Sequence, residues 1–258
     1  MEKIVAGKWD YSLNAKFYRH RPNYSPKAIK MLVEYVEVHD KDNFSVADIG
    51  AGTGNLTIML LNEGLKKITA VEPNDEMRKI GEEVTENTTV KWIRATATET
   101  TLSNQYNWVT FGSSFNVIDR NLALAETYRI LKNNGYFTCM WNHRNLSCPI
   151  QKAAEDIITS FIPEYERGVR REDQRSFLEK NATQFKDICY IEVDFNVKRT
   201  IEEYVLAWKS VKNRFWDLKT EEGIALFSKI IDKIKKELPE VFEIRYTTRA
   251  WTMQKKSK

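Results

Sequence analysis

The fold of this chain is decided by the stretch Val46-Ala47-Asp48-Ile49-Gly50-Ala51-Gly52-Thr53-Gly54-Asn55-Leu56-Thr57. An apolar run ends in an acid, three glycines follow at alternate positions, and the apolar-periodic segment 56–61 begins at once. This order predicts a strand, a tight loop and a helix. Glycine has no Cβ and adopts positive φ, so a ligand can approach the bare backbone and the free N–H groups that begin the helix.

The spacing of the glycines separates two classes of ligand that use such loops, dinucleotides and S-adenosylmethionine. The dinucleotide fingerprint is G-x-G-x-x-G. Here the glycines are Gly50, Gly52 and Gly54, and Asp48 precedes the first by two residues. This spacing argues against a pyrophosphate.

A second short apolar run, residues 68–72, follows about one helix later and ends in Glu72. In a mononucleotide-binding half, a carboxylate at the end of the second strand binds the ribose hydroxyls. Dinucleotide-binding enzymes also have an acid at this position. Glu72 therefore supports a mononucleotide-binding half of the fold, but it does not by itself identify the ligand.

Several motifs resemble one protein family. The pattern Asp48-x-Gly50-x-Gly52-x-Gly54 resembles the first motif of class I S-adenosylmethionine-dependent methyltransferases. Residues 17–24 resemble the Tyr-x-x-x-Arg-Pro-x-Tyr stretch of a small-molecule subgroup, the methyltransferase type 11-like group that includes trans-aconitate-type enzymes, and residues 130–137 resemble its post-motif. Counted from the glycine motif onward, four landmarks in the family's order span residues 46–142.

The resemblance implies an α/β fold, namely a Rossmann-like, seven-stranded, mostly parallel sheet with helices on both faces. We expect one methyltransferase domain over 1–258. It would comprise an N-terminal helical lid (1–45), a cofactor-binding core (46–142), a helical cap insertion (143–187) and C-terminal strands and helices (188–258).

S-adenosylmethionine is the cofactor that the resemblance implies, and Glu72 is the best candidate for its ribose. The family's turn after the third strand usually carries an acid for the adenine, but Ala95-Thr96-Ala97-Thr98 stands here, so backbone groups or the Thr96 hydroxyl must serve. The expected cofactor-binding residues are Asp48, Gly50, Ala51, Gly52, Gly54, Asn55, Glu72, Pro73, Met77, Thr96, Ala97, Ser113 and Arg21. For Met77, a role as core filler is an equal alternative, and Arg21 could equally be a surface residue.

No residue receives a firm catalytic role. The subgroup typically has Gln-Ala-x-His-Trp-Phe-Asp after its fourth strand, whereas Asn116 and Val117 replace the histidine and tryptophan here, which points to a different acceptor. Tyr18, His20, Asn116 and His143 are the candidates for positioning or base work. The candidate substrate-binding residues are Tyr18, Asn116, Trp141, Arg170 and Arg171, and five aromatic residues could line an acceptor pocket, namely Trp141, Phe161, Tyr165, Trp208 and Trp216. The two neighbouring arginines could instead form a surface ion cluster with Glu172 and Asp173.

Composition narrows the remaining choices. A chain of 258 residues that is 42% hydrophobic can build a sizeable core, and a net charge of +4 does not require a polyanionic partner. Cys139, Cys148 and Cys189 lack metal-binding spacing, so we expect no metal and no disulfide framework. No signal peptide or membrane span is apparent. We therefore expect a cytoplasmic protein that binds neither membrane nor nucleic acid; its oligomeric state stays open.

The favoured function is transfer of a methyl group to a small-molecule acceptor by in-line displacement. One alternative is an RNA or protein methyltransferase, against which the mild charge stands. The other is a non-catalytic nucleotide-binding protein of the same fold. The acceptor atom (O, N, S or C) cannot be read from these residues.

Overall fold

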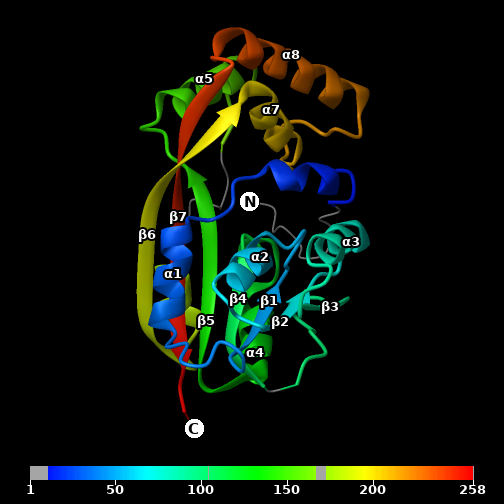
Figure 1. Cartoon of the computed structure of the whole chain (residues 1–258). Coiled ribbons are helices and arrows are strands. Elements are labelled where there is room, and N and C mark those ends of the chain that lie inside the picture. Colours follow the sequence, from blue (N-terminus) through cyan, green and yellow to red (C-terminus); the bar gives the residue numbers. More distant parts are fainter. Residues whose placement is uncertain (1–10, 104, 167–172, 258) are drawn as a thin grey trace.

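The computed structural model describes residues 11–103, 105–166 and 173–257 (Figure 1). Its centre is a sheet in the order β3-β2-β1-β4-β5-β7-β6. The strands are β1 (Ser45–Ile49), β2 (Lys67–Val71), β3 (Lys91–Ile93), β4 (Tyr106–Gly112), β5 (Leu131–Arg144), β6 (Phe185–Thr200) and β7 (Val241–Lys255). Strands β3, β2, β1, β4 and β5 pair in parallel, whereas β7 runs antiparallel to both β5 and β6. The predicted mostly parallel, seven-stranded fold is confirmed.

Helices cover both faces of this sheet. They are α1 (Pro26–Tyr35), α2 (Asn55–Asn62), α3 (Asp75–Val84), α4 (Arg120–Ile130), α5 (Pro149–Phe161), α6 (Arg175–Asn181), α7 (Ile201–Lys209) and α8 (Glu221–Glu237), with the 3₁₀ turns η1 (Ala15–His20) and η2 (Phe115–Val117). Alternate strand residues point to opposite faces. Val46 therefore packs with α1 and α2, and Ala47 packs with α4 and α6.

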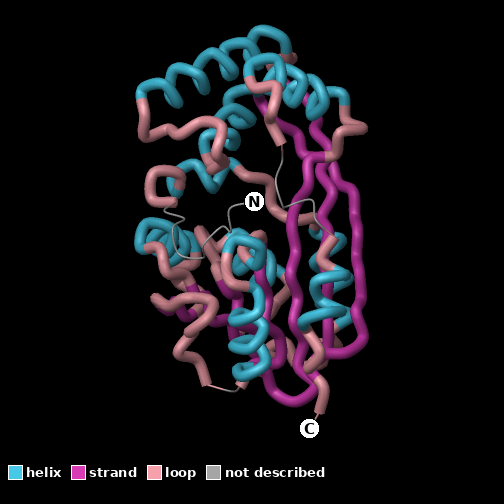
Figure 2. Tube along the Cα trace, turned by 180° about the vertical axis from the view of Figure 1, so that it is seen from behind, coloured by secondary structure: helices cyan, strands magenta, loops and turns pink. Residues whose placement is uncertain are grey.

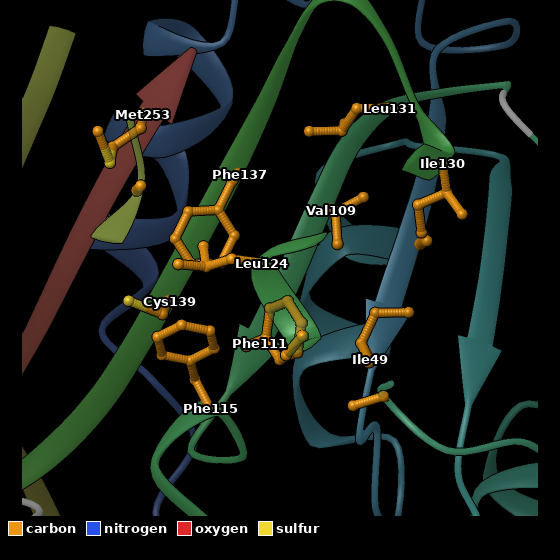
Figure 3. Close-up of a cluster of buried hydrophobic side chains, with 14 of the residues drawn as sticks. Ile49, Val109, Phe111, Phe115, Leu124, Ile130, Leu131, Phe137, Cys139 and Met253 are labelled. Atoms are coloured by element: carbon orange, nitrogen blue, oxygen red, sulfur yellow. The ribbon is translucent and has the colours of Figure 1, made fainter. Parts of the chain in front are cut away.

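The core on the α4 side contains a cluster of aromatic rings. Figure 3 shows Phe111, Phe115 and Phe137 turned toward one another. The ring centroid of Phe115 lies 5.3 Å from those of Phe111 and Phe137. Cys139 is fully buried beside them. Packing of this kind fixes β4 and β5 rigidly beneath the loops that follow them.

Strand β5 is longer than the sequence indicated. The stop signal Asn133-Asn134-Gly135 predicts a helix that ends at Leu131 and a strand over 136–141. In the structure α4 ends at Ile130 and β5 already begins at Leu131, which pairs with Tyr106. At its other end β5 continues to Arg144, since β7 supplies a partner for every residue from Tyr136 onward.

Strands β5, β6 and β7 extend past the short parallel strands and carry a second core (Figures 1 and 2). There, Phe242, Ile244 and Tyr246 pack against α5, α7 and α8. This helical cap thus takes α5 from the expected 143–187 insertion and adds α7 and α8, whereas α6 of that insertion packs in the core beside α4. Within the described residues, no helix combines the length and apolar character needed to cross a bilayer.

The turn η1 lies between the cap and the parallel strands. Asn14 Nδ2 donates to the Lys209 carbonyl at the end of α7, 2.8 Å away, and Asn74 Nδ2 at the start of α3 donates to Ser12 Oγ at 3.1 Å. The N-terminal segment thereby bridges the two halves of the molecule.

Candidate active site

A cavity of about 710 Å³ opens between the carboxyl ends of the parallel strands and the cap. One wall is made by the loops after β1, β2 and β4, and the opposite wall by η1, the end of β5 and α7. Open α/β sheets bind ligands at this edge, because the loops after parallel strands converge there.

The glycine loop after β1 forms part of the first wall of the cavity. Gly50 and Gly52 have φ of +66° and +60°, values that side chains with a Cβ adopt only with strain. A Cβ on Gly50 would lie 2.6 Å from Ser114 Cβ, and one on Gly52 would lie 3.3 Å from Met77 Cε. Both positions therefore need glycine, for the turn and for the close approach of neighbouring side chains.

Glu72 lies at the end of β2, 7% exposed. Gly52 N donates to its Oε2 at 2.9 Å and Asn74 N donates to its Oε1 at 2.8 Å. Burial raises the pKa of this carboxyl, against the effect of the two backbone hydrogen bonds. Each oxygen retains a second lone pair, so the carboxylate can accept further hydrogen bonds from a ligand in the cavity.

Asp48, the acid of the glycine motif, is fully buried near the end of β1. The hydroxyls of Thr57 and Thr110 donate to its two oxygens at 2.7 and 3.1 Å. Burial raises the pKa of this carboxyl to about 6, although both hydrogen bonds lower it. A buried carboxylate in this position supplies negative charge to one end of the cavity.

Most of the expected cofactor-binding residues line the cavity. They are Asp48, Gly50, Ala51, Gly52, Asn55, Glu72, Pro73, Met77, Thr96, Ala97, Ser113 and Arg21. Gly54 is not among the lining residues; it begins α2 with a φ of +83°. The Thr96 hydroxyl accepts from the backbone N–H of Glu99 within its own turn. Tyr24 and Thr53, which we did not single out, also contribute to this wall.

Arg21 fastens the N-terminal segment to the cap. Its Nε donates to Ser210 Oγ at 2.8 Å, and its Nη2 donates to the Ser210 carbonyl at 2.6 Å. The guanidinium carbon lies 3.9 Å from the centroid of the Tyr18 ring. Tyr24 reaches the other wall, where its hydroxyl lies 2.9 Å from Ser113 Oγ. The lid-like segment is therefore tied to both sides of the cavity.

The candidates for acceptor binding and catalysis divide into three groups. Tyr18, Trp141 and Trp208 line the cavity, whereas His20, Asn116, His143, Phe161, Tyr165 and Trp216 are not among its lining residues. Asn116 instead accepts a hydrogen bond of 3.0 Å from the Trp141 indole. Arg170 and Arg171 lie outside the described residues.

Sequence reasoning missed Arg144, Tyr204 and Tyr246, which line the cap wall. The Arg144 guanidinium carbon lies 3.6 Å from the centroid of the Trp208 ring. The available signal was the polar end of the run 136–144, which we read as a loop after a strand that ends at Trp141. Recognising β5 as a longer strand would have placed Arg144 on it.

Comparison with known proteins finds a family that part of the chain resembles. Residues 47–139 match the family model described as a methyltransferase domain. An uncharacterized methyltransferase of Schizosaccharomyces pombe is 28% identical over 142 residues, 55% of this chain and 55% of that protein. One of Mycobacterium tuberculosis is 32% identical over 130 residues, 50% of each. The chain thus spans about half the length of these relatives.

Solved structures resemble a larger share of the chain. A protein described as a type II methyltransferase from Anaeromyxobacter dehalogenans has a TM-score of 0.61 at 14% identity, covering 92% of this chain and 97% of that one. At this identity the likeness concerns the fold alone. Residues 47–139, which include the glycine loop and Glu72, are thus similar to a methyltransferase domain, and the described chain shares the fold of a solved methyltransferase structure.

Proposed function

We propose that the chain is an S-adenosylmethionine-dependent methyltransferase that acts on a small-molecule acceptor. The observation that carries this proposal is Glu72, a carboxylate held by two backbone N–H groups on the cavity wall beside the glycine loop. A carboxylate so placed can accept hydrogen bonds from both hydroxyls of a ribose.

The residues of the first wall fit this cofactor. Glu72 would hold the ribose, and Met77, Thr96 and Ala97 would border the adenine. The backbone at Gly50 and Gly52 would face the amino-acid part of the cofactor; a Cβ at these positions would meet the side chains of Ser114 and Met77. A structural neighbour, phosphoethanolamine N-methyltransferase 2 of Haemonchus contortus, was solved with S-adenosylhomocysteine and phosphomonomethylethanolamine. Its TM-score is 0.52 at 16% identity, over 90% of this chain and 52% of that one.

When bound, the cofactor supplies a sulfonium methyl group that is already a good electrophile, so the protein has to bind, orient and exclude water. Alignment of reactants can supply roughly 7 to 11 kcal/mol in favourable cases. In our proposal the N-terminal lid and the cap orient the reactants and exclude water. Arg21 joins the lid to the end of α7 through Ser210, and Tyr24 joins the lid to Ser113 after β4.

Among the candidate base residues, Tyr18 is the one that lines the cavity. Burial raises the pKa of Tyr24, so its phenol stays protonated and suits hydrogen-bond donation better than proton removal. We propose that Tyr18 and Trp141 contact the acceptor and that neither His20 nor His143 removes a proton from it.

The two facing walls of the cavity favour a small molecule over RNA or protein. Its far wall is formed by cap residues such as Trp208, Val211 and Tyr246, which lie across from the glycine loop. A polymer would need a groove open at both ends, whereas lid and cap are here joined by hydrogen bonds.

The test is incubation with methyl-labelled S-adenosylmethionine and separate metabolite, RNA and protein fractions, with mass identification of the labelled product. We expect label in a small molecule, and its loss in Glu72→Ala. Glu86→Ala, an exposed acid beyond α3, is the matched control. Label in the RNA or protein fraction would show that the acceptor is a macromolecule and would contradict the proposed small-molecule acceptor. Cofactor binding without label in any fraction would favour a non-catalytic protein.

A further inference from the structure

Strand β6 forms one edge of the sheet, and Figure 1 shows it along the outer side of the molecule. The other edge, β3, comprises the three residues Lys91–Ile93. By contrast, β6 comprises the 16 residues Phe185–Thr200 and contains neither proline nor glycine. A very short edge strand offers little backbone for pairing, whereas a long and regular one is a template for a further strand. The edge at β6 is therefore the one at which another chain can pair.

The backbone of β6 is regular over most of its length. Residues 189–200 pair with β7 one by one, and the irregularity of this ladder lies before them, between Lys186 and Cys189. In an antiparallel ladder, alternate residues of an edge strand direct their N–H and C=O groups away from the neighbouring strand. Within the described chain, the backbone of residues 190–199 makes no hydrogen bond apart from those to β7. Its outward groups are thus available to a partner strand.

The two faces of β6 differ in chemistry. The odd-numbered residues from 191 to 197 are apolar and pack against α1 or against the cap: Ile191, Val193, Phe195 and Val197. The even-numbered residues from 190 to 200 are exposed: Tyr190, Glu192, Asp194, Asn196, Lys198 and Thr200. The exposed face therefore carries charges of both signs, which a second strand has to match.

Pairing of two copies along this edge is constrained by symmetry. Two identical antiparallel strands in one sheet are related by a two-fold axis perpendicular to the sheet, and rotation about that axis leaves each face on its own side. Directly opposed residues of antiparallel strands have their side chains on the same face. An even-numbered residue of β6 therefore opposes an even-numbered residue of the second copy, and the exposed residues meet one another.

The charges on the exposed face select the register. With the axis at Asn196, Asp194 of each copy opposes Lys198 of the other copy, so that two ion pairs form. On the other face, Phe195 then opposes Val197. With the axis at Asp194, in contrast, two carboxylates would meet. Opposite charges directly across a strand pair stabilise a sheet and like charges destabilise it, so the first register is favoured.

The ion pairs within the chain favour this register over its neighbour. An axis at Phe195 would bring Lys198 to Glu192, but Glu192 already forms an ion pair of 2.7 Å with Arg249 Nε. Asp194 accepts hydrogen bonds from neutral side chains. Within the described chain, neither Asp194 nor Lys198 forms an ion pair. Each of these two charges therefore gains an ionic partner when a second copy pairs with it.

We propose that β6 is a dimerisation edge, at which a second copy of this chain pairs antiparallel to the first with the two-fold axis at Asn196. Reciprocal ion pairs between Asp194 and Lys198 fix the register, and the two sheets form one continuous sheet. Among the described residues that line the cavity, none belongs to β6. The inference is therefore independent of the proposed function, and substitutions on β6 leave the cavity residues unchanged.

The experiment measures the mass of the full chain in solution by light scattering and its dimer dissociation constant by sedimentation equilibrium. We expect a dimer at micromolar concentration. Lys198→Glu replaces two attractive pairs by two repulsive ones and should raise the dissociation constant roughly 10- to 100-fold. Asp194→Lys should act in the same direction. The double variant Asp194→Lys/Lys198→Glu exchanges the charges and should restore the dimer.

Lys229→Glu is the matched control, because Lys229 is an exposed lysine on α8; it should leave the dissociation constant unchanged. Near-ultraviolet circular dichroism of each variant should match that of the wild type, which separates dissociation from unfolding. A wild type that stays monomeric at high micromolar concentration would overturn the proposal and leave this edge to a strand of a different protein. A dimer that survives in both single variants, or a double variant that stays monomeric, would also overturn it.

Discussion

Replacement of Asp48 by asparagine should stabilise the protein at neutral pH and weaken cofactor binding. The side chain is fully buried, and its hydrogen-bond partners are two threonine hydroxyls and the backbone N–H of Thr57. Asparagine has nearly the same shape. Its oxygen can accept from one hydroxyl and its amino group can donate to the other, because a hydroxyl serves as donor or acceptor. The substitution therefore removes the buried charge and keeps the packing.

The magnitude follows from the pKa. Burial raises the pKa of Asp48 from 3.8 to about 6, and one pKa unit corresponds to about 1.4 kcal/mol, so the charged form costs about 3 kcal/mol of stability. Between pH 3.8 and about 6 the folded state holds a proton that the unfolded chain has released. The wild-type free energy of unfolding therefore falls as pH rises through this window and stays reduced above it.

The assay is urea unfolding of wild type and Asp48→Asn across this pH range. We expect the stability advantage of the variant to grow from the acid end of the window and to level off above pH ~6. Asp232→Asn, an exposed acid on α8, should show no such growth. A gap between Asp48→Asn and wild type that stays constant with pH would refute the reasoning.

Three further substitutions test other parts of the structure. Gly52→Val should abolish S-adenosylmethionine binding in calorimetry and lower stability by about 1 to 3 kcal/mol, because φ is +60° there; unchanged affinity would remove the loop from the site. Glu72→Ala should weaken cofactor binding by about 1.5 to 3 kcal/mol, and an effect of a few tenths would place the ribose elsewhere. Glu126→Gln should destabilise by about 1 to 2 kcal/mol at neutral pH. Burial opposes ionisation of Glu126, but hydrogen bonds from Arg129 and Thr100 hold its pKa at about 2, so this loss should shrink as pH falls from 4.5 toward 2 in acid-unfolding experiments.

The sequence by itself determined the cofactor half of the molecule. The acid and glycines of residues 48–54 and the acid at Glu72 are local patterns, since a strand, its turn and the following helix are adjacent along the chain. Backbone φ values at Gly50 and Gly52 follow from the absence of a Cβ. The seven-stranded sheet was predicted from the resemblance to class I methyltransferases, which rests on local motifs of the same kind.

Only the tertiary structure decided the acceptor half. Arg144 enters the cavity because β5 continues along β7, a strand about a hundred residues later in the chain. Trp208 reaches it from α7, and Arg21 is engaged by Ser210, 189 residues away. Conversely, His20, Asn116 and His143, which were plausible from their positions in the sequence, are not among the residues that line the cavity. Pairing between strands and helices that are distant in the sequence determines which side chains line the same wall of the cavity. No local sequence pattern indicates that pairing.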